Sequence, residues 1–282
     1  MSSDPSNLDF SLADGHGYML DRSHAAACRL NLQFYLWKDA LKFNIHPSIP
    51  VLTTSNITIA DVATGTALWL IDVARAFPGV QIHGFDIDLS QAPPQQWLPS
   101  NTTLQYWNIF EDVPEELVGK YDIVHVRLLI LVIEGGDPRS VLRHLLKLLK
   151  PGGYLQWDDI DCPGMCVKTV DPSVTAPSLE KLREMSYANG RHDWVLRLPE
   201  FAKEVGFEDV EMKFFGDDIE FAKAFNVQHL LTTEEFATSL MRVGEREGAE
   251  RFYRLIGDGY RESLKGAAFC IPRVVCMGRK AG

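Results

Sequence analysis

One stretch constrains the fold of this chain more than any other, the segment ITIADVATGTA at residues 57–67 together with the apolar run LWLIDVA that follows it. A short strand rich in β-branched residues reaches Asp61, turns through Gly65 and becomes an apolar helix. Such a turn presents backbone N–H groups and a helix N-terminus to a ligand, as in α/β nucleotide-binding units. The stretch therefore predicts a strand over 57–61 and a helix over 68–77 that flank a ligand-binding turn.

A second acidic residue gives this turn a more specific meaning. The segment GFDID at 84–88 places Asp86 at the end of the next predicted strand, 80–86. A carboxylate at this point, about twenty residues after the turn, can accept hydrogen bonds from both hydroxyls of a ribose. Gly65 and Asp86 together therefore predict a site for a nucleoside cofactor.

Strand and helix patterns continue to alternate after Asp86. The sequence predicts strands over 103–107, 121–126 and 153–159, a helix over 139–149, and short helical pieces near 91–97 and 112–118. The turn KPGG at 150–153 ends the helix and allows the chain to reverse into a strand. Alternating β and α units predict a parallel sheet with helices on both faces.

Helical patterns dominate on both sides of this region. Apolar residues recur at helical spacing between Arg22 and Phe43, which predicts a helix that caps the nucleotide unit. After residue 160 the patterns predict helices over 178–189, 198–205 and 219–264, and strands over 208–215 and 271–277.

Charge and cysteine usage narrow the kind of partner. The chain has 282 residues, with 38 Asp and Glu against 28 Lys and Arg and a net charge of −10. An acidic surface repels nucleic acids and anionic membranes, so a small molecule is the expected substrate. The five cysteines are scattered without zinc-finger spacing, which predicts free thiols and no metal site. With no signal peptide or membrane span in the sequence, we expect a soluble cytoplasmic protein.

Taken together, these features resemble the class I S-adenosylmethionine-dependent methyltransferases, and among them the fungal methyltransferase-like proteins of secondary metabolism. The stretches that match are YML at 18–20, RLNLQ at 29–33, ADVATGT at 60–66, GFDID at 84–88, YDIVHVR at 121–127 and LKPGGYLQWD at 149–158. They have the order and spacing of the family and cover most of residues 18–160. The C-terminal third matches mainly in layout.

The resemblance implies a Rossmann-like α/β fold. Its seven-stranded sheet would be mostly parallel, with an antiparallel last strand at about 269–278. The implied domains are an N-terminal helical cap over 1–50 and a methyltransferase domain over 51–282, with lid insertions at about 163–197 and 217–265. The implied cofactor is S-adenosyl-L-methionine.

The resemblance also assigns residues to the cofactor. Gly65 would let the backbone approach the methionine part of the cofactor, while Thr64 and Thr66 would offer hydroxyl and N–H groups to its amino and carboxylate ends. Asp86 would accept from the two ribose hydroxyls. The other cofactor-binding residues implied are Tyr18, Arg22, Asn108, Ile109 and Arg127.

Two positions depart from the family pattern. Ala67 stands where a third glycine is common, and it adds a methyl group close to the expected cofactor. Asn108 stands where an aspartate usually accepts from the adenine amino group. An amide carbonyl can still accept that hydrogen bond, but without charge assistance.

Methyl transfer makes modest demands on the protein. A nucleophile must be aligned with the methyl–sulfur bond, and an acidic O–H or S–H must lose its proton. His192, in the run RHDW at 191–194, is the first candidate for a general base or substrate anchor, with Asp159 as its partner. The sequence is equally compatible with the alternative that His192 is an ordinary histidine in a surface loop.

Three functions are compatible with these features. The first is methyl transfer to an O, N, S or C nucleophile of a small secondary metabolite, by a monomer or by a homodimer formed through the cap helix. The second is a pericyclase or dehydratase on the same fold, for which the departures at Ala67 and Asn108 leave room. The third is a non-catalytic regulator of metabolite production, although the acidic charge argues against direct contact with DNA.

Overall fold

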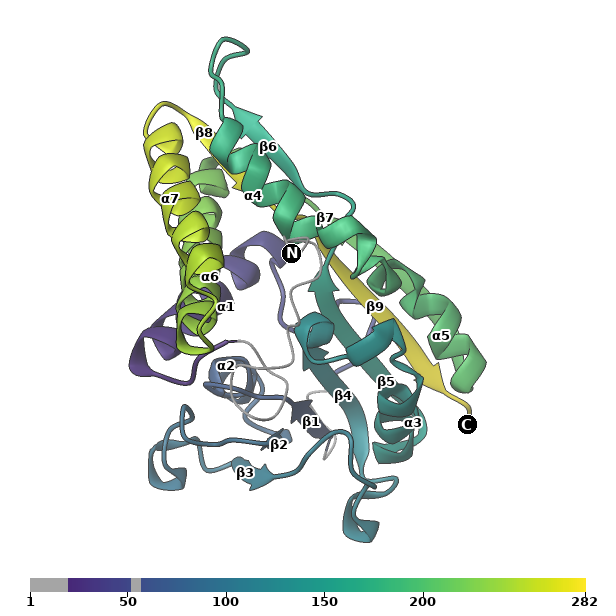
Figure 1. The fold of residues 1–282 in the computed structure, drawn as a ribbon. Coiled ribbons are helices and arrows are strands. Elements are labelled where there is room, and N and C mark those ends of the chain that lie inside the picture. The colour runs from purple at the N-terminus through teal and green to yellow at the C-terminus, as the bar shows by residue number, and fades with distance from the viewer. Residues whose placement is uncertain (1–19, 52–56) are drawn as a thin grey trace. The chain divides into compact units, whose positions relative to one another are not determined.

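A computed structural model gives the structure of the protein and describes residues 20–51 and 57–282. The chain, which Figure 1 colours by residue number, divides into two compact units. Unit 1 consists of Met1–Ala40, Asp161–Asp193 and Phe215–Pro272, and unit 2 consists of Leu41–Ile160, Trp194–Phe214 and Arg273–Gly282.

Unit 2 is built on a seven-stranded sheet. In order across the sheet, its strands are β3 (Thr102–Tyr106), β2 (Gln81–Asp86), β1 (Thr58–Val62), β4 (Tyr121–Arg127), β5 (Leu149–Ile160), β9 (Arg273–Lys280) and β7 (Phe207–Phe215). The pairs from β3 to β5 are parallel, whereas β9 runs antiparallel to β5. The predicted Rossmann-like sheet, mostly parallel with an antiparallel last strand, is confirmed.

Helices cover both faces of this sheet, as a parallel sheet requires. On one face, α2 (Leu68–Ala76) places Trp69 against His125 of β4. On the other face, Trp157 of β5 packs edge-on against Trp194, which precedes α5 (Leu198–Val205). The helix α3 (Arg139–Leu148) contacts α5 and the sheet (Figure 1). The central strands are buried on both sides for this reason.

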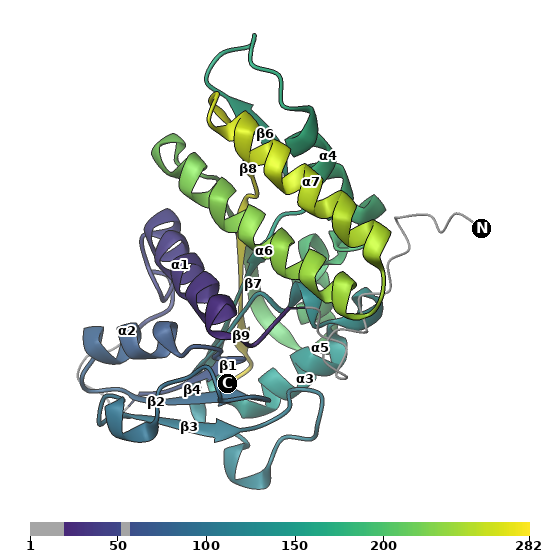
Figure 2. The ribbon, with the colours of Figure 1, turned by 60° about the vertical axis from the view of Figure 1, so that its left-hand side comes forward.

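Unit 1 is mainly helical. It contains α1 (His24–Leu41) up to Ala40, α4 (Pro177–Tyr187), α6 (Ala222–Arg242) and α7 (Arg246–Ser263), together with the antiparallel pair β6 (Cys166–Thr169) and β8 (Ala267–Cys270). The helices α6 and α7 lie side by side in both views (Figures 1 and 2).

Short 3-10 turns link the main elements of both units. They are η2 (Gln95–Trp97), η3 (Glu115–Leu117), η4 (Leu129–Leu131), η5 (Glu134–Gly136), η6 (Ala188–Gly190), η7 (Asp193–Arg197) and η8 (Ile219–Phe221).

Two features of unit 1 differ from the sequence-based prediction. The stretch 219–264, predicted to be helical, forms two helices, because the chain breaks at Gly244, whose φ of 89° separates α6 from α7. The β6–β8 pair was not predicted. Each of its strands has only four residues, and Cys166 pairs with the distant Cys270, which local patterns do not reveal.

The turn after β1 has unusual backbone angles. Ala63 and Ala67 are left-handed, with φ of 59° and 60°, and so is Gly65 between them, with φ of 55°. This conformation costs an L-residue about 1–2 kcal/mol, whereas glycine adopts it freely. The turn is therefore a strained segment.

Replacing Ala63 by glycine should relieve part of this strain. Ala63 is exposed, so Ala63→Gly removes little packing, and we expect it to raise the free energy of unfolding by about 1 kcal/mol. Ala76 is an equally exposed alanine in α2, where the same change should lower stability by up to about 1 kcal/mol. Urea unfolding of both variants measures the difference, and a loss of stability in Ala63→Gly would contradict this account of the turn.

Candidate functional site

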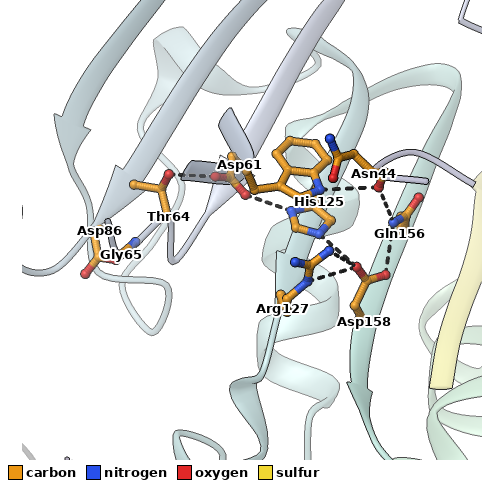
Figure 3. A network of polar contacts seen from close by, with 10 residues as sticks. Asn44, Asp61, Thr64, Gly65, Asp86, His125, Arg127, Gln156 and Asp158 are labelled. Carbon is orange, nitrogen blue, oxygen red and sulfur yellow. Dashed lines mark hydrogen bonds and ion pairs between the residues drawn. The ribbon is translucent and has the colours of Figure 1, made fainter. Parts of the chain in front are cut away.

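The turn that follows β1 is held against the end of β2. The N–H of Gly65 donates to Oδ2 of Asp86 at 2.8 Å, and the N–H of Thr64 donates to the carbonyl of Phe85 at 3.0 Å. Gly65 and Asp86, which sequence reasoning assigned to one site, are therefore adjacent at the carboxyl edge of the sheet (Figure 3).

The carboxylate of Asp86 is fixed from two sides. Its second oxygen, Oδ1, accepts from the N–H of Asp88 at 3.1 Å. Asp86 is half-buried at the end of β2. Its side chain is thus oriented by backbone N–H groups at the carboxyl edge of the sheet.

Thr64 and Thr66 flank Gly65 and are both buried, with 8% and 9% of their surface exposed. The hydroxyl of Thr64 donates to Oδ2 of Asp61 at 2.6 Å. Its hydrogen is therefore directed into the protein, and only its oxygen is available to accept a hydrogen bond from a ligand.

A chain of buried charged side chains starts at Asp61 and crosses the sheet (Figure 3). His125 donates from Nδ1 to Oδ1 of Asp61 at 2.7 Å and from Nε2 to Oδ2 of Asp158 at 3.2 Å. Arg127 donates to the same Oδ2 from Nε at 3.1 Å and from Nη2 at 2.8 Å. His125 is only 2% exposed and Asp158 is fully buried. The chain links the neighbouring strands β1, β4 and β5.

The charged side chains of this hydrogen-bonded chain stabilise one another's ionised forms. Burial alone opposes protonation of His125, but its hydrogen bonds to Asp158 and Asp61 outweigh burial and raise the pKa of the imidazole. Burial likewise opposes ionisation of Asp158, but the charges of Arg127 and His125 outweigh it and lower the pKa of this carboxyl. An imidazolium between carboxylates is therefore the favoured state.

Aromatic and amide groups close around the imidazole. The indole ring of Trp69 stacks on His125, with 3.8 Å between ring centroids and 3° between the planes, which favours a cationic ring. The indole N–H donates to the carbonyl of Asn44 at 3.3 Å. Gln156 donates to that carbonyl at 2.9 Å and to Oδ1 of Asp158 at 3.0 Å. Each of these groups restricts the position of the next.

Sequence reasoning found one end of this chain and missed its centre. The segment HVR at 125–127 led to Arg127, while Asp61, His125 and Asp158 were left without a role in the site. Polar residues within the central, otherwise apolar strands of a parallel sheet were the available signal, since a buried charge requires a partner.

The predicted catalytic residues belong to different units, Asp159 to unit 2 and His192 to unit 1. Asp159 points to the sheet face opposite that of Asp158, as successive strand residues do. It accepts from the indole N–H of Trp157 and from the N–H of Ile160, each at 3.0 Å, and burial raises its pKa to about 7. His192 is half-buried, and burial lowers its pKa to about 4. Their joint action stays a prediction.

Asn108 and Ile109 follow β3. Oδ1 of Asn108 accepts from the N–H of Phe110 at 3.1 Å, which leaves this oxygen one lone pair for a ligand. Ile109 is buried, and its carbonyl accepts from Nδ1 of His144 at 2.8 Å. Both residues are thus fixed by local contacts at the same edge of the sheet as Asp86.

Two further residues predicted to bind the cofactor, Tyr18 and Arg22, belong to the predicted N-terminal cap. Arg22 is half-buried and lies in unit 1, where its N–H donates to Oδ1 of Asp21 at 2.9 Å. Tyr18 lies outside the described residues. The roles predicted for both residues stay predictions.

In residues 20–51 and 57–282, no group of three or more His, Cys, Asp or Glu side chains is arranged to hold a metal ion. None of the helices in the same ranges is long and apolar enough to cross a membrane.

The strand order, the antiparallel β9 and the turn at the carboxyl edge define the class I methyltransferase fold. A chain of the solved complex between the Haloferax volcanii Trm112 methyltransferase activator and its proposed methyltransferase partner has a similar fold. The alignment covers 93% of this chain and 97% of that chain, with a TM-score of 0.52 and 16% identity. At this identity the likeness concerns the fold alone.

Sequence comparison finds similar proteins. Residues 60–155 match the family described as methyltransferase domain. Methyltransferase grgD of a Penicillium species is 39% identical over 118 residues, which is 40% of this chain and 41% of that protein. N-methyltransferase tcpN of Claviceps purpurea is 33% identical over 130 residues, 45% of this chain and 46% of that protein.

A third relative carries a different description. Secondary metabolism regulator LAE1 of Hypocrea atroviridis is 30% identical over 115 residues, which is 40% of this chain and 32% of that protein. The chain spans less than half the length of each of these three relatives. The predicted resemblance to fungal methyltransferase-like proteins of secondary metabolism is confirmed.

Removing the imidazole of His125 should destabilise unit 2. His125→Phe keeps a ring against Trp69 but removes the cation between two buried aspartates. Asp158 keeps its ion pair with Arg127, whereas Asp61 keeps the neutral hydroxyl of Thr64, and we expect a loss of about 3–5 kcal/mol in the free energy of unfolding. Because the pKa of His125 is raised in the folded state, its contribution is full below the unfolded pKa of about 6.5 and is lost as pH rises through the folded value. The stability difference between the two proteins should therefore shrink as pH rises.

His83 is the matched control. It is a half-buried histidine whose pKa burial lowers, so the contribution of its side chain should decrease as pH falls, the opposite direction. Urea unfolding of wild type, His125→Phe and His83→Phe between about pH 5.5 and pH 8.5 tests both signs. A difference for His125→Phe that is constant or grows with pH would show that the buried imidazole is not held as a cation.

Proposed function

We propose that this chain is an S-adenosylmethionine-dependent methyltransferase that acts on a small secondary metabolite, by in-line methyl transfer to an O, N, S or C nucleophile. The observation that carries the proposal is the contact between the N–H of Gly65 and the carboxylate of Asp86. It joins a turn of backbone N–H groups to an acceptor of ribose hydroxyls. The names of two relatives, a methyltransferase and an N-methyltransferase, support the same activity.

The residues of the turn fit a nucleoside without a pyrophosphate. A dinucleotide site uses the pattern G-x-G-x-x-G, whose glycines allow the pyrophosphate to approach the backbone and the helix to pack on the strand. Here Ala63 and Leu68 occupy the first and third of these positions, and Gly65 alone remains. A carboxylate at the end of the second strand is common to both kinds of site, so the glycine pattern is what distinguishes them.

Each part of the cofactor would have its own set of residues. We assign the ribose to Asp86, the methionine part to the turn of Thr64, Gly65 and Thr66, and the adenine to the segment after β3. The remaining assignments are Asn108 and Ile109 for adenine, Arg127 for the carboxylate, and Tyr18 and Arg22 of the cap. The carboxylate role of Arg127 is supported by its two donors to Asp158, which fix the guanidinium at the end of β4.

When bound, S-adenosylmethionine supplies an activated methyl group, so the protein has to orient the acceptor and manage one proton. His192 is our candidate for accepting that proton, because a pKa lowered to about 4 leaves its imidazole neutral near pH 7. Asp159, with a pKa raised to about 7, is the second candidate. Its two oxygens already accept hydrogen bonds, which favours His192.

Location and assembly are finer parts of this proposal. We propose a cytoplasmic enzyme without nucleic-acid partners, on the basis of the acidic charge and the five cysteines, none of which forms a disulfide with another described residue. A homodimer through the cap helix is supported by Leu32 and Tyr35, large hydrophobic residues of α1 that are 39% and 59% exposed.

The ribose role of Asp86 can be tested by calorimetry. Asp86→Ala removes a charge-assisted acceptor of two hydrogen bonds, and we expect the affinity for S-adenosylmethionine to fall by about tenfold to a hundredfold or below detection. Asp112→Ala is the control for loss of charge, because its side chain is 96% exposed and lies after the β3 segment. Equal affinities of wild type and Asp86→Ala would refute the ribose assignment.

The reaction class can be separated from the alternatives by following the methyl group. Incubation with methyl-labelled S-adenosylmethionine and a host metabolite extract should yield a labelled small molecule and S-adenosylhomocysteine. A product of unchanged mass without S-adenosylhomocysteine would favour the pericyclase or dehydratase. The relative named as a regulator keeps the third function open, and no product of either kind despite cofactor binding would favour it.

A further inference from the structure

His125 contacts three side chains around the ligand-binding turn, all of them in unit 2. Its Nδ1 bonds to Oδ1 of Asp61 at 2.7 Å, and its Nε2 bonds to Oδ2 of Asp158 at 3.2 Å (Figure 3). The indole of Trp69, in the first turn of α2, stacks on the imidazole. Asp61 precedes the turn in the sequence and Trp69 follows it, so the imidazole contacts the chain on both sides of the turn.

The imidazole itself is closed off from a ligand. His125 is only 2% exposed, and each of its ring nitrogens already has a carboxylate partner. A group that transfers a proton in a reaction must reach the reacting atom with a nitrogen or oxygen. Any effect of His125 on the reaction therefore has to pass through the residues that it holds.

Asp61 connects the imidazole to the turn. Its Oδ1 is bonded to His125, and its Oδ2 accepts from the hydroxyl of Thr64 at 2.6 Å. Asp61 and His125 are also register partners in the neighbouring parallel strands β1 and β4. A carboxylate that is held through both oxygens cannot rotate freely, and it orients the hydroxyl that donates to it. The orientation of Thr64 therefore depends on His125.

The other side of the turn is held independently of this path. The N–H of Gly65 donates to Oδ2 of Asp86 at 2.8 Å, a contact with β2 in which the imidazole takes no part. The ribose end of the site is thus fixed by β2, whereas the end at Thr64 is fixed through His125. The two parts of a bound cofactor should respond differently to a change of this histidine.

The two carboxylates bonded to the imidazole depend on it to different degrees. Oδ2 of Asp158 also accepts from Nε of Arg127 at 3.1 Å and from Nη2 at 2.8 Å. Besides the imidazole, Asp61 has the neutral hydroxyl of Thr64. A buried carboxylate that loses its cation is destabilised more than one that keeps an ion pair. Loss of the imidazole should therefore disturb Asp61 more than Asp158.

We propose that His125 is a positioning residue for the methionine part of the cofactor, and that it acts through Asp61 and Thr64. The imidazole holds Asp61 in the orientation that accepts from Thr64, and this fixes the turn against which the amino acid part of the cofactor lies. The inference deepens the proposed function, on which it rests, by separating the residues that fix the amino acid part from those that fix the nucleoside.

Two ligands distinguish these parts of the cofactor. S-adenosylhomocysteine carries the amino acid part, whereas 5′-methylthioadenosine has the same adenine, ribose and sulfur but ends in a methyl group. Calorimetry with the full chain measures both affinities. A smaller fraction of folded protein lowers both apparent affinities by the same factor, so their ratio reports on the amino acid part alone.

Two replacements of His125 differ in the contact that they keep. The amide nitrogen of glutamine reaches about as far as Nε2, so His125→Gln keeps a donor toward Asp158 and loses the contact with Asp61. The shorter His125→Asn keeps a donor at the position of Nδ1, toward Asp61. We expect His125→Gln to weaken S-adenosylhomocysteine by about tenfold, with 5′-methylthioadenosine within about twofold of wild type. His125→Asn should restore S-adenosylhomocysteine to within about threefold of wild type.

A second variant cuts the same path and leaves the histidine in place. Thr64→Val removes the hydroxyl that donates to Asp61, and it should give the same selective loss of about tenfold for S-adenosylhomocysteine. His83→Gln is the matched control, because His83 is a half-buried histidine of β2 whose Nδ1 bonds to the hydroxyl of Tyr121 at 2.8 Å. It should leave the ratio of the two affinities unchanged.

The outcomes separate this inference from the proposed function. An unchanged ratio in His125→Gln or in Thr64→Val would overturn the positioning role, and so would a His125→Asn that binds S-adenosylhomocysteine no better than His125→Gln. These results concern the histidine alone, since wild type binds both ligands in each of them. Failure of wild type to bind S-adenosylhomocysteine would instead refute the proposed function, and this inference with it.

Discussion

The hydrogen bond between His125 and Asp61 is the interaction on which the site depends. Asp61 and Asp158 are buried on strands that flank β4, and Asp61 needs the cation between them to compensate its charge. The imidazole of His125 supplies that cation, and Arg127 balances the second carboxylate. The central strands can therefore carry charged groups within an otherwise apolar sheet.

The ligand-binding turn depends on the same chain. Asp61 of β1 accepts a hydrogen bond from the hydroxyl of Thr64, and Asp86 of β2 accepts one from the N–H of Gly65. Side chains of two neighbouring strands therefore fix the turn. Ala63 and Ala67 of this turn have left-handed backbone angles. An L-residue keeps such a conformation only when contacts with the surrounding structure fix it. A turn held in this way loses little conformational freedom on binding a ligand, which favours affinity.

Local signals predicted the parts of the site that lie close together in sequence. A single glycine after a β-branched strand gave the turn, and Asp86 was found from its distance along the chain. His125 and Asp158 were missed because their roles come from neighbouring strands of the sheet, which no local pattern specifies. The pairing of β6 with β8 joins distant segments of the chain, and for the same reason it appeared only in the structure.

The central claim is that the carboxyl edge formed by β1 and β2 binds S-adenosylmethionine. A crystal structure of the chain grown with S-adenosylhomocysteine tests it most directly. The account predicts that both ribose hydroxyls donate to Asp86 and that the amino acid part lies against the turn at Gly65. A nucleoside bound with its ribose away from Asp86, or at a different edge of the sheet, would contradict it.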